Sequence, residues 1–180
     1  MSLDLAERPA PTEYAPWFDR YIALVPDGPI VEMLERQLED TLGLLGGLTP
    51  QKALHAYAPG KWTVAELIGH VADSERVFAY RALCFARGET QPQPGFDEKA
   101  YSANAAGRGG VPFSAVIDDY AVVRRATLSL VRGFTPEAWE RRGIANGKEI
   151  TVRAQAWVIA GHERHHVKVL RERYLQVVQP

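Results

Sequence analysis

Four long segments of the chain repeat apolar residues at the spacing of an α-helix, and this repetition constrains the fold most. They span about residues 29–46, 63–87, 113–131 and 151–177. Apolar residues three and four positions apart lie on one face of a helix, so each segment can bury one side. The apolar positions of the second segment are Val64, Leu67, Ile68, Val71, Phe78 and Phe85. Since no segment has a strong strand pattern, the sequence predicts an all-α fold, a four-helix bundle.

Signals for the ends of helices lie within the same segments. Gly28-Pro29 opens the first helix, and Gly46-Gly47 ends it. Thr63 and Glu66 have the spacing of a capping box at the start of the second helix. Thr151 is the expected cap of the last helix.

The connections differ in length and character. Residues 88–111 are expected to form one long loop, and loops of this length are often functional or mobile. Thr135-Pro136-Glu137 is typical of the cap of a short helical turn. Asn146-Gly147 predicts a tight turn, which Ile144 and Ile150 could flank as a minor hairpin. The helix-breaking residues of the long loop are Pro92, Pro94, Gly107, Gly109 and Gly110.

The first 28 residues differ from the rest because several prolines interrupt them around Trp17, Phe18, Tyr21 and Ile22. We expect residues 1–28 to form an arm with room for one short helix, packed on the bundle through its aromatic side chains. Residues 29–180 are then a single domain. A chain of 180 residues can bury about 70% of its unfolded surface, which is enough for a full core.

Charge and hydropathy exclude several classes of protein. The 21 basic and 22 acidic residues are mixed along the chain and give a net charge of −1, so no basic patch indicates nucleic acid. The doublets Arg124-Arg125 and Arg141-Arg142 are interpreted as solvated faces rather than phosphate sites. No apolar run approaches the roughly 20 residues that cross a bilayer, so no membrane partner is expected. The first residues, Met1-Ser2-Leu3-Asp4, are acidic, unlike a signal peptide.

The single cysteine bears on the cellular compartment. Cys84 alone excludes an intrachain disulfide and fits a reducing environment. Because its neighbours are Leu83 and Phe85, we expect a buried structural thiol rather than a nucleophile. The sequence therefore predicts a cytoplasmic protein.

A His-Glu-x-x-His string occurs at residues 162–166, close to the end of the chain. Two histidines one helical turn apart indicate a divalent metal site, and in zinc peptidases the intervening glutamate is the general base. Those enzymes usually take their third ligand from further along the chain, where few residues remain here. They also need a substrate-binding strand, which is not found. We therefore expect Glu163 to lie on the helix surface or to support the site, and the third ligand to come from upstream.

His162 and His166 lie within about 40° of each other around the last helix. Ile159 and Leu170 share that sector, so both imidazoles project from the face that should be buried. Taken alone, the pair is equally compatible with a structural role and with metal ligation. His165 lies about 100° from His166 and is the expected surface histidine.

His70 strengthens the case for a metal. It lies at the edge of the apolar stripe of the second helix, with Ser74 and Arg81 on its side. A ladder of His, Ser and Arg beside an apolar stripe suits a lined cavity, although Ser74 and Arg81 alone would also fit a helix edge that meets solvent. His55, in the loop before this helix, is expected on the surface.

Three neutral imidazoles can hold Zn²⁺, Ni²⁺ or Fe²⁺ and leave positions open for water or substrate. An open position is typical of a catalytic site rather than a structural one. The missing fourth protein ligand therefore favours chemistry or ligand binding.

The segments around these histidines resemble the signatures of a known family. Residues 61–75, KWTVAELIGHVADSE, and residues 160–166, AGHERHH, resemble the two signatures of the DinB-like (damage-inducible, YfiT-related) superfamily. The segments RRATL at 124–128 and YIALVP at 21–26 look familial too. The likeness spans about residues 14–175.

This resemblance implies a four-helix bundle of up-down-down-up connectivity, with the long loop as a crossover. It also implies a metal site built from His70, His162 and His166, where His165 leaves an ambiguity over which residue pairs with His162. Some members resemble thiol-dependent S-transferases that use bacillithiol, mycothiol or glutathione, and a mycothiol-dependent isomerase belongs to the superfamily.

The leading hypothesis is a metal-dependent enzyme that activates a low-molecular-weight thiol for transfer to an electrophile, with Ser74 or Arg81 orienting the substrate. A metal-dependent hydrolase with bound water as nucleophile is the second hypothesis. The third is a non-catalytic protein that binds a metal or small ligand. Exposed aromatic residues of the arm could support a homodimer contact.

Overall fold

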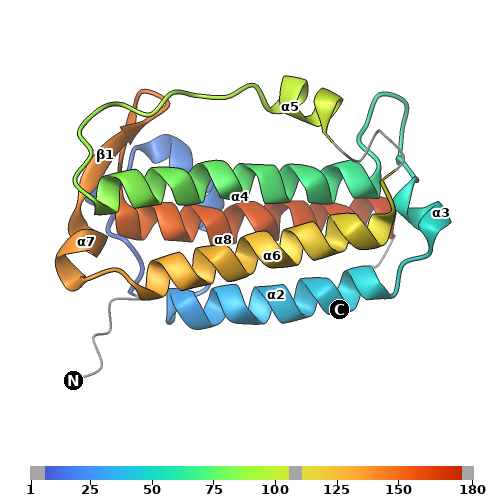
Figure 1. The fold of residues 1–180 in the computed structure, drawn as a ribbon, viewed down its shortest axis with the longest axis horizontal. Helices are drawn as coiled ribbons and strands as arrows, with labels where there is room; N and C mark the ends of the chain where they lie inside the picture. The colour runs from blue at the N-terminus through green and yellow to red at the C-terminus, as the bar shows by residue number, and fades with distance from the viewer. Residues whose placement is uncertain (1–6, 106–110, 176–180) are drawn as a thin grey trace.

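A computed structural model describes residues 7–105 and 111–175, which form a bundle of four long helices (Figure 1). α2 and α8 run in one direction and α4 and α6 in the other, so the predicted up-down-down-up bundle is confirmed. Because α4 and α6 are parallel, the chain must cross the whole length of the bundle between them. The four helices are α2 (Ile30–Gly46), α4 (Val64–Ala86), α6 (Phe113–Arg132) and α8 (Val152–Val169).

The predicted helix caps are present. The hydroxyl of Thr63 accepts a hydrogen bond from the Glu66 amide, and the Glu66 carboxylate accepts one from the Thr63 amide, which completes the capping box of α4. The hydroxyl of Thr151 caps α8 by accepting a hydrogen bond from the amide of Ala154. α8 continues as a short π-helix, η4 (Leu170–Tyr174), and the predicted helix end near residue 177 lies outside the described residues.

The crossover contains a helix that the sequence did not predict. α5 (Glu98–Asn104) interrupts the expected loop, and Asp97 caps it by accepting hydrogen bonds from the amides of Lys99 and Ala100. Figure 1 shows α5 lying over one side of α4. The prediction of a loop rested on the prolines and glycines of this segment and did not take Asp97 into account. The glycines at 107, 109 and 110 lie outside the described residues.

The predicted hairpin is present between α6 and α8. The strands β1 (Arg142–Ala145) and β2 (Lys148–Thr151) pair antiparallel. Asn146 and Gly147 both have positive φ angles, 51° and 72°, which is why an Asn-Gly turn suits this connection. The short helix α7 (Pro136–Glu140) precedes the hairpin and is capped by Thr135, as predicted.

The N-terminal arm packs on the bundle through α8. It contains two 3₁₀ turns, η1 (Pro11–Glu13) and η2 (Pro16–Phe18), and the helical turn α1 (Asp19–Ile22). Phe18 and Ile22 are buried, and the backbone of Tyr21 lies directly against Gly161, where a Cβ atom would overlap its carbonyl group. Another short helix, α3 (Pro50–Ala53), follows α2 and precedes α4 along the chain.

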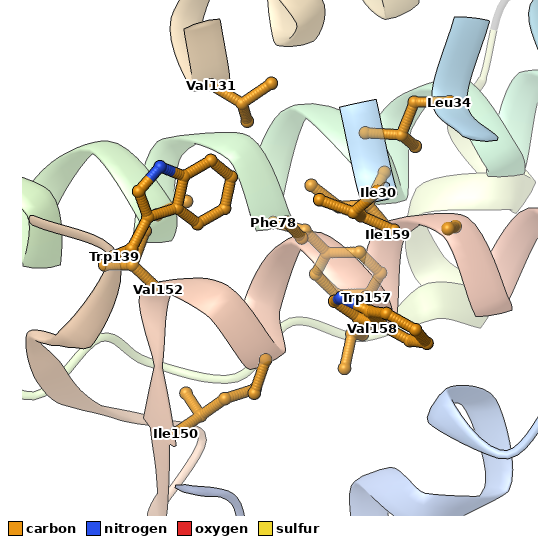
Figure 2. Close-up of a cluster of buried hydrophobic side chains, with 14 of the residues drawn as sticks. Ile30, Leu34, Phe78, Val131, Trp139, Ile150, Val152, Trp157, Val158 and Ile159 are labelled. Carbon is orange, nitrogen blue, oxygen red and sulfur yellow. The ribbon is translucent and has the colours of Figure 1, made fainter. Parts of the chain in front are cut away.

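The main apolar core fills the end of the bundle near the hairpin. Figure 2 shows side chains from α2, α4, α6 and α8 meeting there, among them Phe78, Trp157 and Ile159. A second cluster, at the opposite end, includes Leu67, Tyr120 and Leu170. Full burial of each large aliphatic or aromatic side chain stabilises the fold by roughly 1.5–3 kcal/mol.

Two sequence predictions about single residues are wrong. Arg124 does not lie on a solvated face but is fully buried, although Arg125 and the pair Arg141-Arg142 are exposed as expected. Cys84 is half-buried rather than buried.

Within residues 7–105 and 111–175, none of the helices combines the length and apolar character that a bilayer crossing demands.

Candidate metal centre

The structure brings together the three histidines that the sequence singled out. His70 of α4 and His162 and His166 of α8 each offer a ring nitrogen, and these nitrogens all lie within 4.8 Å of one another. His162 and His166 are one turn apart on the face of α8 that packs on α4, and their Nε2 atoms are 3.1 Å apart. The centre of the His70 ring lies 5.1 Å from that of His162 and 4.8 Å from that of His166.

Two ring nitrogens of this cluster lack a hydrogen-bond partner. Nε2 of His70 and Nδ1 of His166 are buried without a hydrogen-bond partner among the described residues. Such unpaired buried polar atoms cost free energy unless a ligand satisfies them. Nδ1 of His70 has the Ser74 hydroxyl 3.5 Å away, which leaves Nε2 for a ligand. The donor set therefore fits a divalent transition metal.

The electrostatics keep the three rings in the form that binds metals. Burial lowers the pKa of His70 to about 4 and that of His166 to about 3. Burial also lowers the pKa of His162 well below its usual value, and repulsion from the neighbouring histidines adds to the effect. All three imidazoles are thus neutral at pH 7, the form in which histidine binds a metal.

Aromatic side chains surround the cluster. The ring of Trp62 lies 4.6 Å from that of His70, and the rings of Tyr21 and Phe78 lie 5.3 and 5.4 Å from that of His162. These contacts come from the N-terminal arm, from the residue before the α4 cap and from α4 itself. They pack against the rings of His70 and His162 and restrict their orientation.

The two remaining histidines are exposed, as predicted. His165 is next to His166 in the chain, but its ring packs edge-on against Tyr21 at 6.1 Å and does not join the cluster. His55 lies outside the cluster, beside Tyr174. His166, rather than His165, therefore lies beside His162 in the cluster.

Ser74 and Arg81 lie deeper than a helix edge that meets solvent. Ser74 is fully buried beside His70. Arg81 is also buried, and its Nη2 donates a hydrogen bond to the carbonyl oxygen of Pro94 in the crossover, 2.6 Å away. Its guanidinium lines a small cavity of about 70 Å³ together with Tyr21 and Phe78, the two rings that touch His162.

Glu163 does not lie on the helix surface and is buried on the other side of α8. One carboxylate oxygen accepts hydrogen bonds from Thr41 Oγ1 at 2.7 Å and from Tyr120 Oη at 2.6 Å. The other oxygen is 2.7 Å from Nη2 of Arg124 and accepts a hydrogen bond from Gln37. Glu163 therefore faces α2 and α6, away from the histidines, and is not placed as a general base.

Arg124 is the residue that sequence reasoning missed. Its guanidinium also binds both carboxylate oxygens of Glu75, each at 2.7 Å. Burial alone would lower the pKa of Arg124, but the two carboxylates outweigh burial and raise it. A signal was present in the sequence, because Arg124 lies one turn after Tyr120 and one turn before Thr127, on the apolar stripe of its helix.

A pocket of about 520 Å³ adjoins the histidine cluster at His166. Its aromatic lining comes from Tyr57, Trp62 and Tyr174, and two exposed lysines, Lys61 and Lys99, add positive charge. Lys99 belongs to α5, so the unpredicted helix of the crossover supplies one wall. The pocket is large enough for a small organic molecule beside the cluster.

Known proteins share this arrangement of helices. YfiT from Bacillus subtilis, described as a probable metal-dependent hydrolase with an unusual four-helix bundle topology, superposes with a TM-score of 0.69 at 20% identity, over 97% of this chain and 98% of that one. The mycothiol-dependent maleylpyruvate isomerase superposes with a TM-score of 0.63 at 17% identity, over 81% of this chain and 61% of that one. At these identities the likeness shows the fold.

Two sequence comparisons agree with the fold. The protein OB0413 of Oceanobacillus iheyensis, provisionally named a metal-dependent hydrolase, is 25% identical over 138 residues, which cover 73% of this chain and 78% of that protein. The family model of the DinB superfamily matches residues 33–170, a span that includes all three clustered histidines. The chain belongs to the DinB superfamily.

Proposed function

We propose that this protein is a divalent-metal-dependent enzyme that transfers a low-molecular-weight thiol to an electrophile. The observation that carries the proposal is the cluster of three neutral imidazoles, two buried and one half-buried, in which a ring nitrogen of His70 and one of His166 lack a hydrogen-bond partner. His70, His162 and His166 would hold the cation, and Ser74 would fix the ring of His70. The expected cation is Zn²⁺, Ni²⁺ or Fe²⁺.

The surroundings of the cluster favour a thiol as nucleophile. When bound, a divalent cation lowers the pKa of the group that it coordinates. The pKa of a free thiol is about 8.5, whereas that of water is about 15.7. A thiol therefore needs less help from a general base. Glu163, the acid of the His-Glu-x-x-His string, is held by Arg124 and Thr41 on the far side of α8.

The pocket beside His166 supports the same proposal. Lys61 and Lys99 would attract an anionic group of the thiol or of the electrophile, while Trp62 and Tyr57 would contact its apolar part. Arg81, held by the carbonyl of Pro94, would orient the substrate from the side of Phe78. A mycothiol-dependent enzyme among the structural neighbours is consistent with a thiol cosubstrate.

Metal analysis followed by a thiol screen tests this proposal. Protein purified without chelator or histidine tag should carry about one divalent metal per chain, and should conjugate at least one of bacillithiol, mycothiol or glutathione to a chromogenic electrophile. His70→Gln and His162→Gln should lose both the metal and the turnover, whereas His55→Gln should retain both. Full metal content in His70→Gln would contradict the assignment of ligands.

Hydrolysis is the second candidate, because OB0413 is provisionally named a metal-dependent hydrolase and YfiT is described as a probable one. Turnover of esters or amides without added thiol, abolished by His162→Gln, would favour it over transfer. Metal binding without turnover on either panel would favour a metal- or ligand-binding protein.

A further inference from the structure

A second pocket, of about 350 Å³, lies between α2 and α8 on the side of α8 that faces away from the histidines. Gln37 and Asp40 of α2 line one wall, and Glu163, Arg164 and Lys168 of α8 line the other. Arg171 of η4 extends that second wall. No residue of the histidine cluster lines this pocket, so it is separate from the candidate metal centre.

Three polar atoms of this pocket have no partner within the described part of the chain. Gln37 is only 7% exposed, and its Oε1 is buried without a hydrogen-bond donor. Nε2 of the same amide donates to the carbonyl oxygen of Ala160 and to Glu163, which fixes the orientation of the group. Nε of Arg164 and Nε of Arg171 are likewise buried, and neither has an acceptor. Buried polar atoms are normally paired, so three orphans in one pocket point to a ligand.

The charges that remain in the pocket define what it would bind. Glu163 is paired with Arg124, and Lys168 lies 3.8 Å from Glu172. Among the residues that the structure describes, Arg164 and Arg171 have no acidic partner. Two guanidinium groups with free N–H donors are the usual receptor for a carboxylate or another oxyanion. The free oxygen of Gln37 needs a donor on the same ligand.

We propose that this α2–α8 pocket is a binding site for a small amino- or hydroxy-carboxylate. The carboxylate accepts hydrogen bonds from Arg164 and Arg171, and the ammonium or hydroxyl group donates to Oε1 of Gln37, with Asp40 nearby for an ammonium charge. The site is independent of the metal chemistry proposed above. It lies against Glu163, the residue that follows His162, so a bound ligand rests on the helix that carries two of the three histidines.

Calorimetric titration of the full chain with matched pairs of probes tests this proposal. L-Glutamate should bind saturably and at least fivefold more tightly than glutarate, which lacks the ammonium group. Arg164→Gln and Arg171→Gln should each weaken glutamate binding at least tenfold. Arg173→Gln alters an exposed arginine of the same η4 segment and should change the affinity for glutamate less than twofold.

Two further measurements distinguish this pocket from the metal centre and from a contact between two copies of the chain. The affinity of His70→Gln for glutamate should stay within twofold of that of the parent protein, because the pocket does not depend on the metal centre. Three outcomes would overturn the proposal: no saturable binding, equal affinities for glutamate and glutarate, or equal losses in Arg171→Gln and Arg173→Gln. A fourth such outcome would come from native mass spectrometry. If the parent protein is a dimer and Arg171→Gln is a monomer, the pocket is a dimer interface rather than a ligand site.

Discussion

Arg124 and Glu163 form an ion pair of 2.7 Å inside the bundle, where their side chains are 0% and 1% exposed. The pair joins α6 to α8, and Glu75 of α4 binds the same guanidinium. Nη1 of Arg124 also donates a hydrogen bond to the carbonyl oxygen of Leu34 in α2, 3.2 Å away, so all four long helices meet at one buried arginine. A buried charge without its partner is costly, so this network makes the packing of the helices specific.

Arg124→Met should destabilise the protein severely. The substitution leaves Glu75 and Glu163 buried without their cation, and breaking such a pair costs roughly 3–5 kcal/mol. Urea unfolding measures the loss, and Arg125→Met, at the exposed neighbouring position, is the control, with an expected change within about 0.5 kcal/mol. Equal midpoints for the two variants would show that the network does not stabilise the fold.

Gly161→Ala should destabilise the protein although alanine is the better helix former. The new Cβ would overlap the carbonyl group of Tyr21 and push the arm away from α8. Gly69→Ala is the matched control, because no atom lies within 4 Å of the position of its Cβ in α4. Helix propensity should raise the free energy of unfolding of Gly69→Ala by up to about 1 kcal/mol. Gly161→Ala should have a lower melting temperature than the parent protein.

Acid should destabilise the metal-free protein through its buried histidines. The folded state holds the pKa of His70 near 4, below its ordinary value of 6.5, so the unfolded chain binds more protons between these values. The contribution of His70 to stability is therefore complete above about pH 6.5 and is lost as the pH falls towards about 4. Between pH 7 and 5 this loss is at most about 2 kcal/mol.

Urea unfolding at pH 7 and pH 5 measures this effect. The free energy of unfolding should drop less in His70→Gln than in the parent protein. In His55→Gln, a change at an exposed position, the free energy of unfolding should drop as much as in the parent protein. If the free energy of unfolding drops equally in the parent protein and in His70→Gln, a neutral imidazole is not buried at this position.

Metal removal should lower the melting temperature. A ligand that binds only the folded state adds about 2.7 kcal/mol at a hundred times its dissociation constant, so Zn²⁺ should stabilise the metal-free protein and a chelator should reverse the gain. His162→Gln should show neither response, whereas His165→Gln, outside the cluster, should show both. Differential scanning calorimetry with and without metal provides the measurement.

Sequence periodicity was sufficient to predict a four-helix bundle, because each long helix has an apolar stripe, and the threonine caps of α4 and α8 marked two of the helix starts. The up-down-down-up connectivity came from the resemblance to the family. The same periodicity placed His162 and His166 on an inward face and His70 at the edge of an apolar stripe, and the structure brings the three residues together. Their role as ligands stays a prediction. Glu163 and Arg124 were harder to place, because a charged residue on a helix is usually solvated. Their burial depends on Glu75, Tyr120 and Thr41, which come from three different helices and meet only in the folded chain.

The separation of α5 from the bundle core has an evolutionary consequence. Apart from Ser102, the residues of α5 have substantial contact with solvent, yet Lys99 lines the pocket beside His166. Substitutions at exposed positions usually change stability by less than about 0.5 kcal/mol. The crossover can therefore accumulate mutations that alter what enters this pocket while the buried histidines and their helices stay intact. Selection can act on ligand preference and on folding almost independently.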